Sequence, residues 1–106
     1  MITIEEFMKC EFVVARVIEA KEHPNADKLL VLKVDVGGEE RQLVAGIRKS
    51  YAPENLIGRR IVMVKNLQPA VIRGEESQGM ILAASDEDGV SILQPDREVK
   101  IGARIK

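Results

Sequence analysis

One run of residues, Phe12 to Lys21, constrains the fold of this chain more than any other stretch of its sequence. The run is rich in β-branched residues, which favour an extended backbone. In its first half, apolar residues occupy both odd and even positions. This pattern predicts a long strand whose first half is buried on both faces. A strand of that length is able to curl and pair twice, which the closing of a small β-barrel requires.

Three further runs predict strands, and the signals between them predict how the strands connect. The break from His23 to Asp27 contains a proline and residues that favour turns. Gly37-Gly38 is the signal of a tight hairpin, and Pro53 suits the first position of a helical turn that Gly58 ends. The strands themselves are expected at residues 30–36, 41–45 and 61–65.

Residues 66–80 join the fourth expected strand to a fifth, Met80–Ala84, and this connection is too long for a simple hairpin. Long loops on a rigid scaffold carry function more often than short loops do, so we expect a functional surface here. After a turn at Asp86–Gly89, the segment Val90–Leu93 is expected to extend the sheet.

Five short strands with a helical turn between the third and fourth follow the order of a five-stranded Greek-key OB barrel. We therefore expect an all-β fold, with residues 1–106 as a single domain, because a chain of this length builds one core. Thr3 and Glu6 have the capping-box spacing of a short helix before the barrel, and apolar residues also follow Leu93. Such terminal extensions pack by default on their own domain; the other solution, which we predict, is a homodimer interface.

Charge is divided unevenly along the chain, although the net charge is only −1. Seven of the eight charged residues from Arg41 to Arg73 are basic, and the remainder of the chain has an acidic excess. A basic middle segment can follow the phosphates of a nucleic acid while the acidic remainder limits non-specific binding. The alternative is that folding interleaves these charges in space and leaves no basic patch.

Catalytic and metal sites lack the residues that they need. His23 is the only histidine, and Ser77 lacks the glycine that a nucleophile elbow places two residues before its serine. One cysteine and one histidine cannot complete a zinc site, so we interpret His23 as a turn residue and Cys10 as a packing residue. We therefore expect no enzyme activity and no cofactor. The lone cysteine and the lack of any run long enough for a membrane helix indicate a cytoplasmic protein.

The composition favours one class of nucleic acid over another. The aromatic residues are Phe7, Phe12 and Tyr51, too few for the stacking platform that single strands need. Folded RNA, recognised through phosphates, 2′-hydroxyls and close backbone approach, suits the polar residues better. An ordinary polar crossover, with Met80 as the first core residue of the fifth strand, is the alternative for the long loop. Residues of the types that folded RNA requires are Lys28, Lys33, Arg41, Arg73, Ser77, Gln78 and Gly79.

Four motifs spread over nearly the whole chain form one pattern. They are His23-Pro24-Asn25-Ala26-Asp27-Lys28-Leu29, Lys33-Val34-Asp35-Val36-Gly37, Asn66-Leu67-Gln68-Pro69, and Arg73-Gly74 followed by Ser77-Gln78-Gly79-Met80. Together these motifs resemble the tRNA-binding domain family. That domain is shared by the C-terminal region or β subunit of methionyl-tRNA synthetase, free-standing tRNA-binding proteins and eukaryotic synthetase-associated cofactors.

The resemblance implies an OB barrel that forms a homodimer through its extensions and holds tRNA by its overall shape, near the outer elbow. It implies an accessory domain of methionyl-tRNA synthetase or a free-standing protein, with aminoacylation left to a catalytic region elsewhere. It implies tRNA contacts at Lys33, Ser77 and Met80, with Arg73 and Asn66 as supports. Together with the residues chosen by type, the predicted tRNA-binding set is Lys28, Lys33, Arg41, Lys65, Asn66, Arg73, Ser77, Gln78 and Met80.

A second function class remains open at this point. Bacterial homodimers of similar size and fold act as chaperone-like or export-related peptide binders. A peptide binder of this kind needs an exposed apolar groove, whereas the RNA-binding alternative needs the basic residues from Arg41 to Arg73 to converge beside Ser77.

Overall fold

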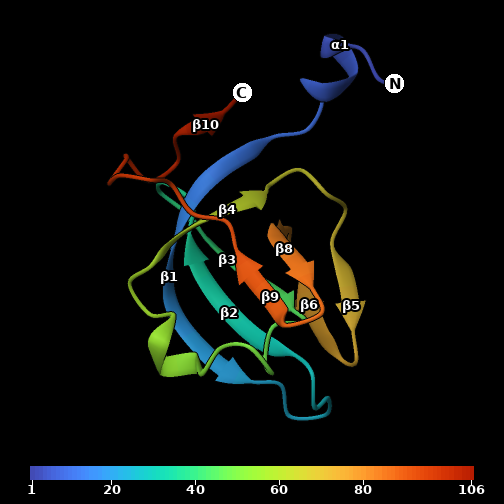
Figure 1. Ribbon diagram of the computed structural model, residues 1–106, viewed down its shortest axis with the longest axis vertical. Coiled ribbons are helices and arrows are strands. Elements are labelled where there is room, and N and C mark those ends of the chain that lie inside the picture. Colours follow the sequence, from blue (N-terminus) through green and yellow to red (C-terminus); the bar gives the residue numbers. More distant parts are fainter.

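The long first strand is present, and it organises the barrel by pairing with different strands along its length. In the computed structural model, which describes residues 1–106, β1 runs from Phe12 to Glu22. Its first half pairs with β4 (Arg60–Val64) and its second half with β2 (Leu30–Asp35), as the strand curls across the barrel (Figure 1). A register shift between Val17 and Glu19 accommodates this curl, because a bulge increases the local twist. The expectation that this strand pairs twice is confirmed.

The main sheet has the order β3-β2-β1-β4-β7, with antiparallel pairs throughout. β3 spans Glu40–Ala45 and β7 spans Met80–Ile81, and a 3-10 turn, η1 (Pro53–Asn55), lies between β3 and β4. A short C-terminal strand, β10 (Arg104–Ile105), pairs with the start of β1. The predicted all-β, OB-like barrel of five strands, with one helical turn between the third and fourth, is therefore confirmed.

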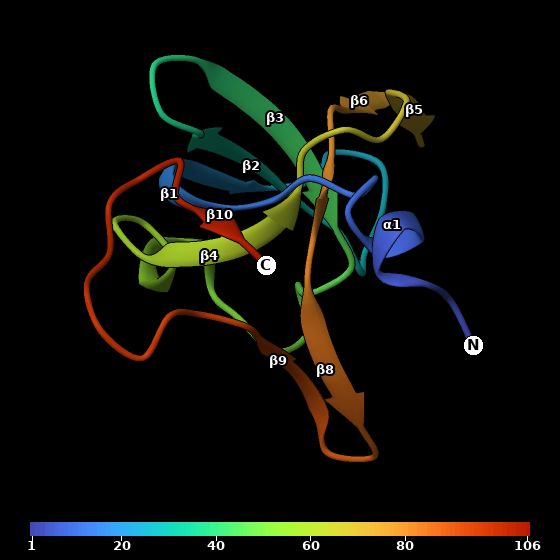
Figure 2. The same cartoon turned by 90° about the horizontal axis from the view of Figure 1, so that it is seen from above.

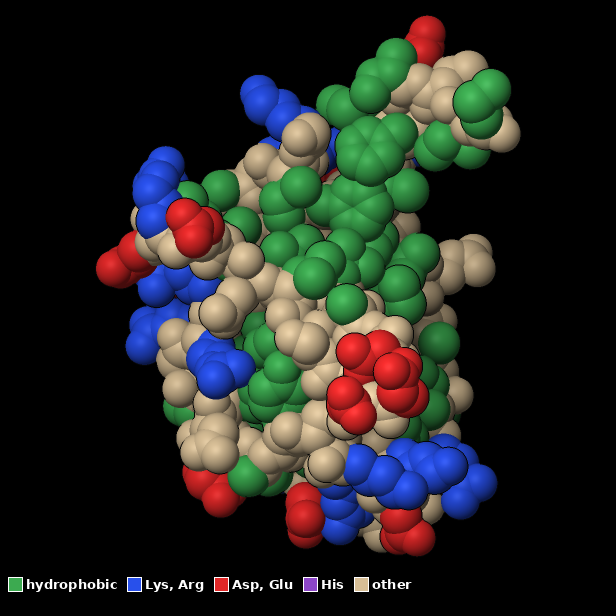
Figure 3. Space-filling view, in the orientation of Figure 1, with side chains coloured by type: hydrophobic (Ala, Val, Ile, Leu, Met, Phe, Trp, Pro, Cys, Tyr) green, Lys and Arg blue, Asp and Glu red, His purple; other side chains and the backbone are tan.

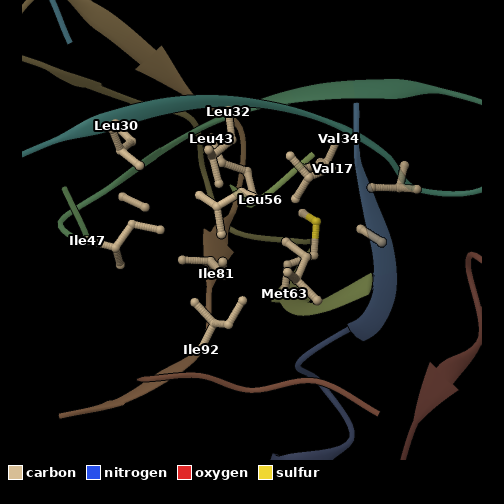
Figure 4. Close-up of a cluster of buried hydrophobic side chains, with 14 of the residues drawn as sticks. Val17, Leu30, Leu32, Val34, Leu43, Ile47, Leu56, Met63, Ile81 and Ile92 are labelled. Carbon is tan, nitrogen blue, oxygen red and sulfur yellow. The ribbon is translucent and has the colours of Figure 1, made fainter. Parts of the chain in front are cut away.

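Alternate side chains of the barrel strands fill one apolar core (Figure 4). On β2, Leu30, Leu32 and Val34 point inward, so the intervening Lys33 must point outward. Leu56, directly after η1, adds a fully buried side chain from the connection between β3 and β4. The outward face of β2 thus carries Lys33 and Asp35 beside the buried Val31.

The long connection after β4 is not an irregular loop, and this part of the prediction was wrong. It contains a hairpin of two short strands, β5 (Ala70–Ile72) and β6 (Glu75–Ser77). Arg73 and Gly74 form its two-residue turn, with φ of 54° and 94°, the pair of left-handed residues typical of a tight hairpin. The sequence concealed this turn because Arg replaces the Asn or Asp that normally precedes the glycine.

The fifth strand is also shorter than expected, because the chain leaves the barrel at Leu82. β8 (Ala83–Asp86) pairs with β9 (Gly89–Ile92) in a separate hairpin that projects from the barrel (Figure 2). The predicted single strand Met80–Ala84 and the extension of the main sheet by Val90–Leu93 were therefore wrong. The side chains of β8 are small or polar and all exposed, so they cannot cover a core.

The N-terminal helix α1 (Ile4–Phe7) begins with the expected capping box. The backbone N–H of Glu6 donates to Thr3 Oγ1 at 3.1 Å, and the N–H of Thr3 donates to Glu6 Oε1 at 3.1 Å. The helix projects away from the barrel (Figure 1), and Ile4 is 68% exposed. Phe7 alone packs inward, with its ring centroid 5.4 Å from that of Phe12. The default expectation that the domain covers this helix was wrong.

The barrel closes through two side chains and a single backbone hydrogen bond rather than through a further backbone ladder. One edge of β3 pairs with β2, and the other edge presents the N–H groups of Gln42 and Val44. Gln78 Oε1 accepts from Gln42 N–H at 3.0 Å, while Gln78 N–H donates to Gln42 C=O at 2.7 Å. Ser77 Oγ accepts from Val44 N–H at 3.0 Å and donates to Gly79 C=O at 2.9 Å. We call these bonds from residues 77–79 to β3 the seam.

We expect Gly79→Ala to lower the free energy of unfolding by about 3 kcal/mol, because the seam leaves no room for a side chain. A Cβ at Gly79, where φ is +140°, would lie 2.7 Å from both Met63 Cε and Val64 O. Gly38→Ala is the matched control, because its φ is +101° but nothing lies within 4 Å of the added Cβ. The control should lose only about 1 kcal/mol from backbone strain. Equal losses in urea denaturation of the two variants would contradict the crowded seam.

Candidate functional site

A polar surface covers the outward faces of β1, β2 and β3, and Lys33 lies at its centre. Lys33 pairs in register with Gln42 on β3 and with Glu19 on β1. Its Nζ lies 3.9 Å from Glu19 Oε2, and 43% of its side chain is exposed, so this ion pair is weak. A shallow cavity of about 340 Å³ is lined here by Lys21, Lys33 and Gln42, among others. The ammonium of Lys33 is therefore free to meet a ligand.

The β5–β6 hairpin borders this surface, and Gln42 joins the two. Gln42 Nε2 donates to Glu76 C=O at 2.8 Å, in addition to the seam bonds of its backbone. Arg73, at the tip of the hairpin, is exposed, and its Nη2 donates to Asn25 C=O at 3.3 Å in the loop between β1 and β2. The same loop carries the exposed Lys28. The structure thus places Lys28 and Arg73 on adjoining segments beside the surface that holds Lys33.

Three other predicted residues have structural partners instead of free polar groups. Arg41 Nη1 donates to Lys65 C=O at 2.7 Å and to Gln78 C=O at 3.3 Å. Arg41 and Lys65 also share Glu39, at 3.2 and 3.8 Å. Asn66 accepts from Glu11 N–H at 2.8 Å and donates to Lys9 C=O at 2.7 Å, so its amide fixes the segment before β1.

Ser77 and Gln78 form the seam. Ser77 is 4% exposed, and its hydroxyl already donates one hydrogen bond and accepts another. A hydroxyl has one proton to donate, so Ser77 has none left for a ligand. Both residues therefore position the strands around them.

Met80 is not the core residue that the alternative interpretation of the loop required. It is 47% exposed and lines an apolar groove of about 510 Å³. The groove runs between the two hairpins, with Leu67 and Ile72 on one side and Ala83 and Val90 on the other. Met80 is thus available for contact with a ligand.

The basic segment from Arg41 to Arg73 does not form one patch. Arg48 pairs with Glu22 at 3.1 Å, and Arg60 pairs with Glu98 at 3.1 Å, in addition to the two pairs at Glu39. Figure 3 accordingly shows the basic side chains of this face in separate groups with acidic ones between them. Basic and acidic side chains are therefore interleaved on the surface, because acidic residues from outside the basic segment pair with the basic residues inside it.

Gln42 was missed as a site residue in the sequence. It connects the polar surface to the hairpin, but its only sequence signal is its place opposite Lys33 in a β2–β3 hairpin. No cluster of three or more potential metal-ligating side chains is present, and no helix has the length and hydropathy needed to cross a bilayer.

Comparison with known proteins identifies what this chain is similar to. Residues 12–104 match the family described as "Putative tRNA binding domain". The chain is 52% identical over 105 residues to methionine–tRNA ligase of Pyrococcus furiosus, a match that covers 99% of this chain and 14% of that protein. The chain thus spans only a small part of the length of this curated relative.

The solved structures that match the whole chain include two with different descriptions. A MetRS-related protein from Pyrococcus horikoshii has a TM-score of 0.93 and 39% identity, with coverage of 100% of this chain and 98% of that chain. The chaperone CsaA from Bacillus anthracis strain Ames has a TM-score of 0.91 and 32% identity, with coverage of 100% and 99%.

We expect Ser77→Ala to lower the free energy of unfolding by about 1–3 kcal/mol, because the buried N–H of Val44 loses its acceptor. Ser85→Ala is the matched control, since Ser85 is exposed on β8, and it should change stability by less than about 0.5 kcal/mol. Denaturant unfolding followed by circular dichroism measures both variants. A Ser77→Ala protein as stable as the control would show that this hydroxyl does not hold the seam.

Proposed function

This chain belongs to the tRNA-binding domain family, and from that membership we propose that it binds tRNA by overall shape rather than by nucleotide sequence. The observation that carries the proposal is the family match, which extends from Phe12 to Arg104 and so includes the whole barrel. The chain acts as an accessory domain of methionyl-tRNA synthetase or as a free-standing protein of the same family, in the cytoplasm. It contributes tRNA affinity and no catalysis of its own.

The proposed contact surface consists of Lys33, Lys28, Arg73 and Met80. The three basic side chains suit phosphates, because Lys28 and Arg73 form no ion pair and Lys33 forms only a weak, exposed one with Glu19 at 3.9 Å. Met80 and the groove beside it offer an apolar surface to a sugar or a base. Arg41, Lys65, Asn66, Ser77 and Gln78, the remainder of the predicted set, support this surface through the bonds described above.

Folded RNA fits this surface better than a single strand does, because the aromatic rings are already engaged. Phe7 and Phe12 pack against each other, and the ring of Tyr51 lies under Arg59. The Tyr51 hydroxyl also accepts from Ile92 N–H at 3.0 Å. No exposed ring remains on which successive bases would stack.

We further propose that the active form is a homodimer joined through the terminal extensions. Ile2, Ile4 and Met8 are exposed around α1, and Leu93 is exposed at the end of β9. Figure 3 shows hydrophobic side chains extending from α1 across the adjoining part of the barrel. A second copy would remove this apolar surface from water, and a two-fold axis would pair each extension with its equivalent.

A second candidate function is peptide binding. The observation that favours it is the apolar groove of about 510 Å³ between the two hairpins, together with the similarity to CsaA, which is described as a chaperone. An extended peptide with apolar side chains is the class of ligand that such a groove accepts. Titration of tRNA against a labelled unfolded peptide distinguishes the two candidates, because the proposed function requires tRNA to bind at least about tenfold more tightly.

We expect Lys33→Ala and Lys28→Ala each to weaken tRNA binding about three- to tenfold and to lower the slope of log K against log salt by about one unit. Lys100→Ala is the control, since Lys100 is also an accessible lysine but lies on the C-terminal segment. Filter binding at several salt concentrations measures all three variants. If the control changes the slope as much as Lys33→Ala does, the proposed surface is wrong.

We expect Ile4→Asp to shift the protein from dimer to monomer, because each interface would then bury two carboxylates without partners. Ile57→Asp is the matched control, since Ile57 is also exposed but lies beside η1, away from the extensions. A chain that begins at Glu11 should also be monomeric. Light scattering that finds the truncated chain still dimeric would refute the assignment of the interface.

A further inference from the structure

A buried histidine joins the β5–β6 hairpin to the loop between β1 and β2. His23 is only 2% exposed, although it lies in a turn. Its Nδ1 lies 2.9 Å from Asn25 N, and its Nε2 lies 3.0 Å from Ile72 O. An amide N–H can only donate and a carbonyl can only accept, so the ring is the neutral tautomer with its proton on Nε2.

The two strands of the hairpin are attached to the protein in different ways. β6 is held to β3 by the seam and by Gln42, through several hydrogen bonds. β5 pairs only with β6, and the single hydrogen bond from β5 to any other segment is that of Ile72 C=O with His23. A two-stranded ribbon is marginally stable by itself, so this bond restrains the outer strand.

The same contact fixes the distance between two proposed ligand-binding segments. Arg73 follows Ile72 directly, and its Nη2 donates to Asn25 C=O at 3.3 Å, next to the turn that His23 forms with Asn25 N–H. Arg48 holds the far side of that loop, donating to Ala26 C=O at 2.9 Å. Two hydrogen bonds therefore connect the hairpin to this fixed loop. One is the long bond from the exposed Arg73 at the tip, and the other is the buried bond of His23, which alone holds the backbone of β5.

We propose that His23 is a positioning residue for RNA binding, which holds Arg73 and the hairpin in the binding geometry before the ligand arrives. This inference rests on the proposed function and names a residue that does not itself touch the RNA. Its physical basis is preorganisation: a hairpin that is free at β5 must lose conformational entropy on binding, and that loss weakens affinity.

Two substitutions separate the two hydrogen bonds of the ring. In His23→Asn, the side-chain oxygen takes the place of Nδ1 and keeps the bond from Asn25 N–H, as in an ordinary Asx turn, but it cannot reach Ile72. In His23→Gln, the side-chain amide nitrogen takes the place of Nε2 and can still donate to Ile72 C=O. The second variant is thus the conservative rescue of the bond to the hairpin.

The experiment measures tRNA affinity, its salt dependence and backbone amide exchange in both variants. We expect His23→Asn to weaken tRNA binding about five- to tenfold, and His23→Gln to bind within about twofold of the natural chain. The salt slope should stay unchanged in both, because the bound state keeps its phosphate contacts. Amides of residues 70–77 should exchange faster in His23→Asn alone, while those of β1 and β2 should not.

The possible outcomes distinguish this inference from the proposed function. If the natural chain binds tRNA and His23→Asn binds equally well, the positioning role is overturned and the proposed function stands. If both variants weaken binding equally, the turn rather than the hairpin bond is responsible, and the inference is again overturned. If the natural chain does not bind tRNA, the proposed function fails, whatever the variants do.

A measurement on the natural chain covers the case in which His23→Asn does not fold. The imidazole Nε2 proton should be visible by NMR and exchange slowly with water, because it is buried and bonded to Ile72 C=O. A ring proton on Nδ1, or one that exchanges as fast as that of an exposed histidine, would overturn the inference.

Discussion

The structure depends on how the free edge of β3 is satisfied. A barrel of this size has to close, and the inward side of that edge is buried, so the N–H groups of Gln42 and Val44 need acceptors. The acceptors come from side chains, Gln78 Oε1 and Ser77 Oγ, because the chain bends at Gln78 and Gly79 and makes only one backbone bond to β3, from Gln78 N–H to Gln42 C=O. Gly79 permits that turn, since no side chain would fit between Met63 and Val64.

This seam determines what the neighbouring polar residues can do. A buried hydroxyl whose single proton is donated within the protein has none to donate to a ligand, and this applies to Ser77. Three basic side chains remain accessible to a ligand. Lys33 lies on the outward face of β2, and Lys28 and Arg73 lie on the two segments beside it. The proposed function therefore uses a rigid barrel whose closing bonds also orient the contact surface.

Charge shows most clearly what the sequence could not determine. Seven basic residues lie between Arg41 and Arg73, yet folding brings Glu39, Glu22 and Glu98 against four of them. Proximity along a strand says little about proximity on a surface, because successive side chains point to opposite faces and acids from other strands fill the gaps. Arg73 keeps an exposed guanidinium because it lies in a turn at the tip of a hairpin.

Several features could be predicted from the sequence: the all-β fold, the long curled β1, the helical turn before β4 and the capping box of α1. Each of these follows from local periodicity or local turn chemistry, which a single stretch of residues contains. The sequence also contains the motifs that identify the family. Three other features emerge only in the folded chain: residues 70–77 form a hairpin, Ser77 is buried, and His23 is bonded to Ile72. The burial of Ser77 and the bond of His23 depend on contacts between residues 33 and 49 positions apart, which no local pattern records. The hairpin is a local feature, but its turn has Arg73 in place of the usual Asn or Asp and so escapes the usual signal.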